Sequence, residues 1–206
     1  MQLSAEIRYF WMESVPLEIK DWYFVGNQQP FPAGGGGTRV DEYFRDPSQN
    51  ELGAKRRGGG SGIELKGLVA YADFELASPF QGQVEIWAKW ATMAIEICGN
   101  TTISVEKRRW LRKLDMGGPA PIEIPLDSEG GPIGNNRSPD EGCNVELVEL
   151  RLIEGDIWWT FALEAFGTKA KTNLRLAAEA LSMRHPPTFS PQVVASYPTW
   201  LNTSLP

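Results

Sequence analysis

The sequence predicts an α+β fold, a closed or nearly closed antiparallel β-barrel of about eight strands with two or three flanking helices. Most apolar residues fall in short runs that alternate with polar residues, which is the period of a β-strand. Turn-forming Gly, Pro and Asp separate these runs, and helical spacing is confined to one early and one late segment. Closing such a sheet would remove its edges and give it an inside.

The composition is typical of a soluble globular chain with one domain. Of its 206 residues, 42% are hydrophobic and 22% are charged, which is enough to bury a substantial core. We expect one barrel domain over residues 1–185 and a Pro-rich C-terminal tail over residues 186–206, which either drapes over the domain or stays loose. The sequence leaves the oligomeric state open between a monomer and a homodimer.

Charge and hydropathy exclude several classes of partner. The formal net charge is −6, which argues against general nucleic-acid binding. No apolar run approaches the roughly 20 residues that a membrane-spanning helix needs, and the N-terminus does not resemble a signal peptide. We therefore expect a cytoplasmic protein with neither a nucleic-acid nor a membrane partner.

Cysteine and histidine are too scarce for several kinds of site. The two cysteines, Cys98 and Cys143, lie in or beside apolar runs, and His185 is the single histidine. A disulfide framework, a zinc site and catalysis by a histidine base are therefore not expected.

The first half of the chain is predicted to hold four strands and one helix. Residues 3–11 alternate as a first strand, and residues 14–25 have the spacing of a short amphipathic helix. Residues 27–37, with their four-glycine run, are predicted to be a loop before a second strand at 38–45. The stretch 51–70 holds two alternating runs around a Gly-rich turn and is predicted to form a β-hairpin.

The second half is predicted to add four strands and a final helix, with one ambiguous segment at 95–99 that either extends a strand or ends a short helix. In chain order the segments are a strand at 84–90, a basic strand at 103–114, a long loop at 115–142 with a brief strand at 122–124, strands at 145–153 and 157–165, and an amphipathic helix at 172–182.

Several of these strands carry charge at every second position. Pointing outward, such faces would be an ordinary solvated surface; pointing inward, they would line a cationic lumen with carboxylates on one side. That lumen would suit a polyanion, because Arg and Lys bind phosphate oxygens and carboxylates can hold a divalent cation. Alternation alone leaves both readings open. The charged positions are Glu6 and Arg8; Lys55 and Arg57, or Arg56; Glu64 and Lys66; Glu85 and Lys89; Glu106 and Arg108, or Lys107 and Arg109; Glu146 or Glu149; and Glu164.

The order of these motifs resembles the CYTH superfamily, the triphosphate tunnel metalloenzymes. The similarity spans residues 3–182, and it lies in the order and spacing of six short motifs. They are Ser4-Ala-Glu-Ile-Arg8, Asp41-Glu-Tyr-Phe-Arg-Asp46, Leu52 to Arg57, Ile63-Glu-Leu-Lys66, Val105-Glu-Lys-Arg-Arg-Trp110, and the pair Val145-Glu-Leu-Val-Glu-Leu150 with Trp158-Trp-Thr-Phe-Ala-Leu-Glu-Ala-Phe166.

The resemblance implies an eight-stranded tunnel that binds a triphosphate or polyphosphate, a small phosphorylated anion, and hydrolyses it with Mg²⁺ or Mn²⁺. Glu6 and Glu164 would be the catalytic carboxylates on the metal side. The implied metal ligands are Glu6, Glu64, Glu149 and Glu164, and the implied phosphate-binding residues are Arg8, Arg57, Lys66, Lys89, Lys107 and Arg109.

Two positions depart from the family pattern. Ser4 and Ala162 stand where the opening and closing motifs have a glutamate. Because hard divalent cations need several oxygen ligands, their loss would weaken a two-metal site. Two alternatives therefore stay open beside a metal-dependent triphosphatase. One is a catalytically silent domain that binds a phosphate ligand or a partner, and the other is an unrelated β-domain with its charges outside.

Overall fold

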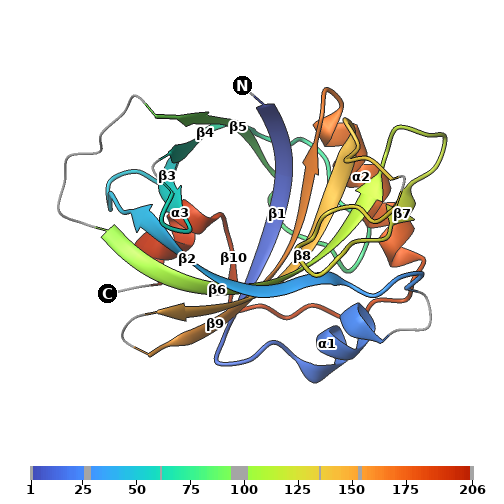
Figure 1. Cartoon of the computed structure of the whole chain (residues 1–206), viewed down its shortest axis with the longest axis horizontal. Helices are drawn as coiled ribbons and strands as arrows, with labels where there is room; N and C mark the ends of the chain where they lie inside the picture. The colour runs from blue at the N-terminus through green and yellow to red at the C-terminus, as the bar shows by residue number, and fades with distance from the viewer. Residues whose placement is uncertain are drawn as a thin grey trace.

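A closed β-barrel forms the body of the protein (Figure 1). The computed structural model describes residues 2–25, 29–60, 62–93, 102–134, 136–152 and 155–204. Within these ranges eight antiparallel strands follow one another around the barrel in the order β1-β5-β4-β3-β2-β6-β8-β9, and β9 pairs back with β1. The predicted α+β barrel is thus confirmed.

The barrel strands correspond closely to the predicted alternating runs. They are β1 (Gln2–Met12), β2 (Gly34–Phe44), β3 (Leu52–Arg57), β4 (Ile63–Tyr71), β5 (Glu85–Thr92), β6 (Thr102–Asp115), β8 (Gly142–Leu152) and β9 (Ile157–Phe166).

The remaining described elements lie around the barrel. Two short strands extend it, because β7 pairs with β6 and β10 pairs with β1. Helices α1 and α2 lie against its outer wall, whereas α3 packs at one end of its interior. Their bounds are β7 (Ile122–Ile124), β10 (Val193–Val194), α1 (Leu17–Phe24), α2 (Ala170–Ser182) and α3 (Tyr197–Thr203).

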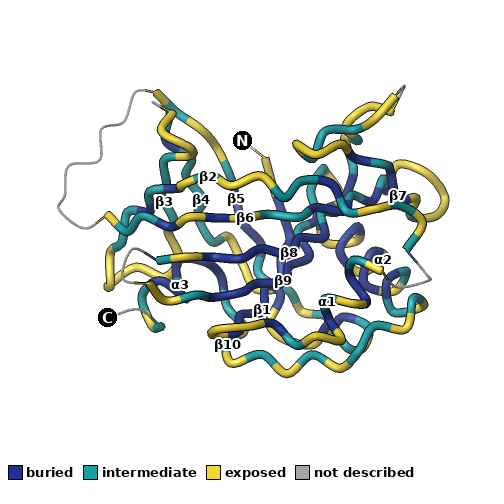
Figure 2. Tube along the Cα trace, turned by 60° about the horizontal axis from the view of Figure 1, so that its bottom comes forward, coloured by how far each residue is buried: buried dark blue, intermediate teal, exposed yellow. Residues whose placement is uncertain are grey.

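The largest hydrophobic core lies outside the barrel, between its wall and the two outer helices. Alternate residues of β1, such as Ile7 and Tyr9, point outward and meet the apolar stripe of α2, which includes Leu174 and Leu181. Figure 2 shows the buried residues concentrated along β1, β8 and β9, the strands beneath these helices. Burying each such side chain stabilises the fold by about 1.5–3 kcal/mol.

A second cluster closes one end of the barrel interior. Trp200 of α3 is fully buried and stacks on Phe10 of β1 with ring centroids 4.9 Å apart. Trp158 of β9 meets the Trp200 ring edge-on at 5.6 Å. Since residues 10 and 158 share the inward faces of their strands, α3 fills the interior at this end.

The predicted loop at 27–37 is wrong over its last four residues, because β2 already begins at Gly34. Gly35 and Gly36 have φ angles of 93° and 98°, in the left-handed region that glycine tolerates. The register with β6 slips between Gly35 and Thr38, so the glycine run forms a β-bulge. A Cβ on Gly35 would lie 2.5 Å from the Arg109 carbonyl oxygen, so the glycine permits this close pairing.

The tail after His185 covers the domain along its described length. It passes over the barrel wall, adds β10 to β1 and ends in α3. The ambiguous segment at 95–99, which includes Cys98, lies outside the described residues, as do residues 26–28 between α1 and β2. Within the described ranges, none of the helices is long and apolar enough to cross a membrane.

Candidate functional site: a charged cavity inside the barrel

The barrel contains an open cavity of about 460 Å³, and almost half of the residues that line it are charged. Among the described residues, nine Lys and Arg residues and five carboxylates line it. A further carboxylate, Asp41, is fully buried against basic side chains of the same wall. Basic groups therefore outnumber acidic ones in the cavity, although the whole chain is acidic.

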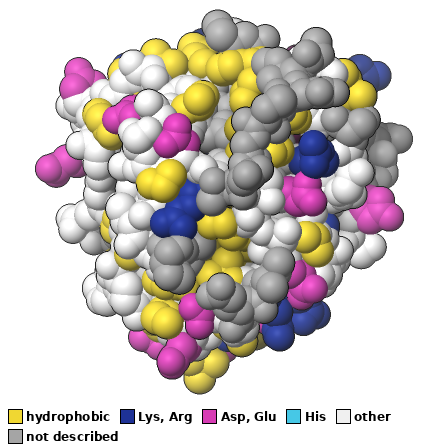
Figure 3. Space-filling view, turned by 90° about the vertical axis from the view of Figure 1, so that its left-hand side faces the viewer, with side chains coloured by type: hydrophobic (Ala, Val, Ile, Leu, Met, Phe, Trp, Pro, Cys, Tyr) yellow, Lys and Arg dark blue, Asp and Glu magenta, His cyan; other side chains and the backbone are white. Residues whose placement is uncertain are grey.

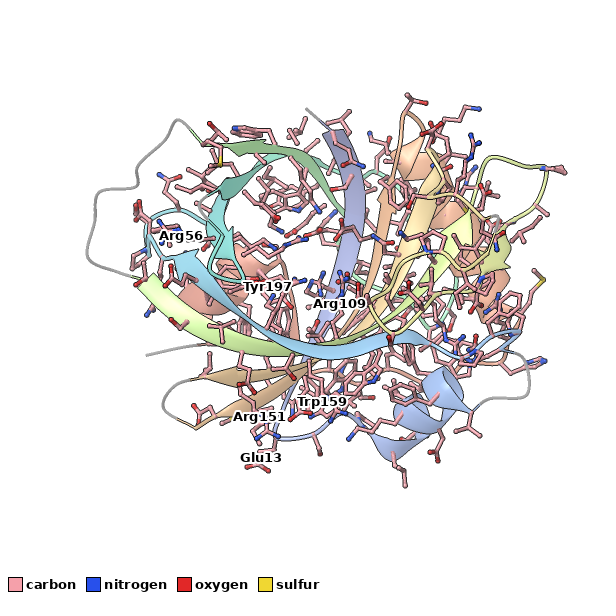
Figure 4. The ribbon with its side chains drawn as sticks, viewed as in Figure 1. Glu13, Arg56, Arg109, Arg151, Trp159 and Tyr197 are labelled. Carbon is pink, nitrogen blue, oxygen red and sulfur yellow. The ribbon has the colours of Figure 1, made fainter. Side chains whose placement is uncertain are left out.

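The charged faces of the strands point inward, as one of the two sequence interpretations predicts. Figure 4 shows Arg109 and Tyr197 inside the ring of strands, whereas Arg151 and Trp159 lie outside it. Acidic and basic side chains are interspersed on the outer face in Figure 3. The cationic surplus thus belongs to the interior.

Glu6 of β1 is the centre of one ionic network. Its two carboxylate oxygens lie 2.7 Å from Lys66 Nζ and 3.3 Å from Lys89 Nζ. Lys89 Nζ also lies 2.8 Å from Glu164 of β9. Burial alone would raise the pKa of Glu6, but Lys66 and Lys89 outweigh it and hold that pKa well below its usual range.

Glu146 of β8 is the centre of a second network. It lies 3.3 Å from the Arg8 guanidinium and 3.2 Å from that of Arg109. Burial opposes its ionisation, but Arg8 and then Arg109 lower its pKa to about 2. Arg8 is itself buried, and its Nε has no hydrogen-bond partner among the described residues.

A third network joins β2, β3 and β4. Asp41 Oδ1 accepts a hydrogen bond from Arg39 at 3.0 Å, and Lys55 Nζ lies 3.9 Å from Asp41 Oδ2. One carboxylate oxygen of Glu64 lies 3.2 Å from Lys55 Nζ, and the other lies 2.9 Å from Arg57 Nε. Each carboxylate of this network is therefore shared between at least two cations.

Lys107 of β6 lies at the closed end of the cavity. Its ammonium lies 3.7 Å from the centroid of the Tyr197 ring, 3.8 Å from Asp41 Oδ2 and in hydrogen-bond contact with the Tyr43 hydroxyl. Burial, followed by the repulsion of Lys55, lowers the pKa of Lys107 well below its usual range.

Nine of the ten site residues predicted from sequence line this one cavity. The exception is Glu149, which occupies the other face of β8 and accepts a hydrogen bond from the outward Arg151 at 2.8 Å. The inward glutamate of β8 is Glu146, the alternative that alternation left open. The nine are Glu6, Arg8, Arg57, Glu64, Lys66, Lys89, Lys107, Arg109 and Glu164.

Several further residues at the cavity were missing from the predicted set, among them three of β2 and one of α3. Arg39 and Tyr43 lie at alternate positions of β2, with the buried Asp41 between them. Because side chains alternate within the predicted strand 38–45, the sequence does indicate that these three residues share one face. Tyr197 belongs to α3, whose place inside the barrel has no signal in the local sequence.

The carboxylates of the cavity, as arranged here, do not fit a divalent cation. Among the described residues, no three Asp, Glu, His or Cys side chains lie together as a metal-binding group. Both oxygens of Glu6 already face ammonium groups, and Glu164 shares one of these groups. A divalent cation would have to displace a lysine.

Comparison with known proteins assigns no family to this chain. No protein-family model matches the sequence, and no curated protein matches it either. The resemblance to the CYTH superfamily therefore stays a prediction.

Proposed function

We propose that the barrel binds a small polyphosphate anion, such as inorganic tripolyphosphate or an organic triphosphate, inside its cationic cavity. The observation that carries the proposal is the surplus of lysine and arginine around one cavity. Their N–H groups form short, charge-assisted bonds to phosphate oxygens, and these bonds are stronger at low local dielectric than in water.

The arrangement of the basic residues favours an anion with several negatively charged groups. They come from six strands, β1 to β6, and thus surround the cavity rather than forming one patch. Arg8 has a buried N–H without a partner among the described residues, which is a donor ready for an incoming oxygen. The resemblance to the triphosphate tunnel family points to the same ligand class.

Isothermal titration with tripolyphosphate tests this function. Saturable binding is expected, together with an increase in the melting temperature, because a ligand that binds only the folded state stabilises it. Orthophosphate should bind more weakly, since it contacts fewer cations. Absence of any heat or stabilisation with tripolyphosphate, in EDTA and in Mg²⁺ alike, would contradict the proposal.

Two neighbouring arginines of β3 provide a matched pair of variants. Arg57 lines the cavity, whereas Arg56 is not among its lining residues and pairs with Glu42 at 2.7 Å. Arg57→Ala should weaken tripolyphosphate binding about tenfold, the cost of one charge-assisted hydrogen bond. Arg56→Ala should leave the affinity unchanged. Equal losses in both variants would indicate a general charge effect instead of a site.

Hydrolysis of the bound anion is the second candidate activity. The resemblance supports it, and lysine and arginine also stabilise the charge that develops in phosphoryl transfer. Release of phosphate from tripolyphosphate and nucleoside triphosphates, measured with Mg²⁺ and with Mn²⁺, tests it against Glu164→Ala. If the wild type releases phosphate no faster than this variant does, the protein binds the anion without hydrolysing it.

A further inference from the structure

Lys89 occupies the space between two carboxylates that lie side by side. Glu6 and Glu164 are directly opposite one another in the register of β1 and β9. Like charges at opposite positions of neighbouring strands repel. The ammonium of Lys89, from the strand on the other side of β1, lies 3.3 Å from Glu6 Oε2 and 2.8 Å from Glu164 Oε1.

The charge of this pair is already balanced by the protein itself. Lys66 supplies a second ammonium to Glu6 at 2.7 Å, so two cationic groups face two carboxylates. Lys89 Nζ lies within hydrogen-bond distance of both carboxylates and thus bridges them.

An oxygen atom without a partner lies next to this pair. Asn144 of β8 is directly opposite Glu164 in the register of β8 and β9, and it lines the cavity. Its Oδ1 is buried and has no hydrogen-bond partner among the described residues. Without Lys89, the two carboxylates would border the vacated position, with the amide oxygen of Asn144 on the neighbouring strand. These are the hard oxygen ligands that Mg²⁺ and Mn²⁺ prefer.

We propose that the Lys89 ammonium takes the place of a divalent cation between Glu6 and Glu164, so that the cavity binds its phosphate ligand without metal. The second half of this statement rests on the proposed function, whereas the first half concerns the free protein. The identity of residue 89 would then decide whether the carboxylate pair serves as a cation site. Lys89 would also present its remaining N–H donor to the ligand.

Direct titration with Mn²⁺, in the absence of phosphate, tests the first half. Wild-type protein should show no saturable binding at the pair, and Lys89→Met should gain at least about tenfold in Mn²⁺ affinity. Lys89→Arg, which keeps the charge, should behave as the wild type. Lys89→Gln serves in place of Lys89→Met if circular dichroism shows that the latter does not fold.

Two results would overturn this half. One is Mn²⁺ binding by the wild type that Glu6→Gln abolishes, because the pair would then hold a metal despite Lys89. The other is equal Mn²⁺ affinity of folded Lys89→Gln and wild type, because Lys89 would then exclude nothing.

Tripolyphosphate titration of the wild type in EDTA tests the second half. Binding in EDTA is expected, whereas binding only when Mg²⁺ or Mn²⁺ is present would overturn metal independence and leave the proposed function standing. No binding under either condition would contradict the proposed function and, with it, this half. The Mn²⁺ titration would still decide the role of Lys89.

Discussion

Lys107 combines several properties that rarely occur in one lysine. It is buried, it lies against the Tyr197 ring, and its nearest carboxylate oxygen, on Asp41, is 3.8 Å away. Burial and then Lys55 lower its pKa from the ordinary value of 10.5. A polyanion in the cavity would favour the ammonium form and raise this pKa again.

Binding of tripolyphosphate should therefore be coupled to proton uptake at Lys107. At any pH between the lowered pKa of the free protein and the raised pKa of the complex, the complex holds the additional proton. Titration in two phosphate-free buffers with different ionisation enthalpies measures this uptake. In the Lys107→Met variant, the proton uptake that accompanies binding at alkaline pH, below the ordinary lysine pKa of 10.5, should disappear. Uptake that is the same in this variant would place the proton elsewhere.

At the level of single residues, the sequence predicted which side chains share a face but not which face is inside. The period of two groups Lys107 with Arg109 and separates both from Arg108. The choice between the two sets depends on where the helices pack, since the apolar faces of strands such as β1, β6, β8 and β9 turn toward them. This long-range fact also explains why Glu149 was chosen and Glu146 was not.

Helix α3 is a structural part of the cavity wall. Trp200 and Leu201 are buried, and Tyr197 and Pro198 line the cavity from the same short helix. The Asn202 side-chain amide donates to the carbonyl oxygens of Asp46 and Gln49 at 2.9 and 3.0 Å. The helix is thus attached both to the barrel interior and to the turn after β2.

Removing the Trp200 ring should destabilise the whole domain. Trp200→Ala leaves a cavity against Phe10 and is expected to cost about 3–5 kcal/mol of unfolding free energy. Thr203→Ala, in the exposed last turn of α3, should stay within about 0.5 kcal/mol of the wild type. Urea unfolding measures both. A cost below about 1 kcal/mol for Trp200→Ala would show that α3 is not docked in solution.

The elements that the sequence missed have a common physical cause. Polar and apolar side chains alternate through residues 38–45 and predict the strand there. Gly34 to Gly37 have no side chains that could alternate, so the start of β2 has no such signal. Similarly, α3 spans seven residues with a proline near its start, and such a segment is helical mainly because tertiary packing stabilises it. The long periodic segments, by contrast, lie close to their predicted bounds.

For the whole molecule, the sequence predicted the number of strands and a closed or nearly closed barrel, but not which two strands pair to close it. Closure depends on the pairing of β1 with β9, which are separated by most of the chain. No local pattern encodes a contact at that separation. The ionic networks around Glu6 and Glu146 are also non-local, since each joins strands that lie far apart in the sequence.

The buried carboxylates make stability depend on pH in the acid range. The pKa values of Glu6, Asp41 and Glu146 are lower in the folded protein than in the unfolded chain, although burial opposes this, because lysine and arginine neighbours outweigh it. As the pH falls, the unfolded chain therefore binds protons first. The stability from Glu146 is fully present above about pH 4.5 and is lost as the pH falls toward about 2.

The unfolding free energy should accordingly decrease from about pH 5 to about pH 2. A pKa that falls from 4.5 to about 2 corresponds to about 3 kcal/mol for one carboxylate. Glu146→Gln should be less stable at neutral pH but should lose less stability on acidification. Chemical denaturation at several pH values measures both slopes. If the unfolding free energy depends on pH in the same way in both proteins, the arginine neighbours do not lower the pKa of Glu146.

The position of the main core outside the barrel has a consequence for sequence change. Ser4 and Ala162 lie on the inward faces of β1 and β9, whereas the neighbouring residues Ala5 and Leu163 belong to the core on the other side. Replacing an inward side chain alters the chemistry of the lumen while leaving the apolar contacts that drive folding in place. Over generations, the interior of such a barrel can lose or gain ligand-binding groups one at a time, and the architecture survives each exchange.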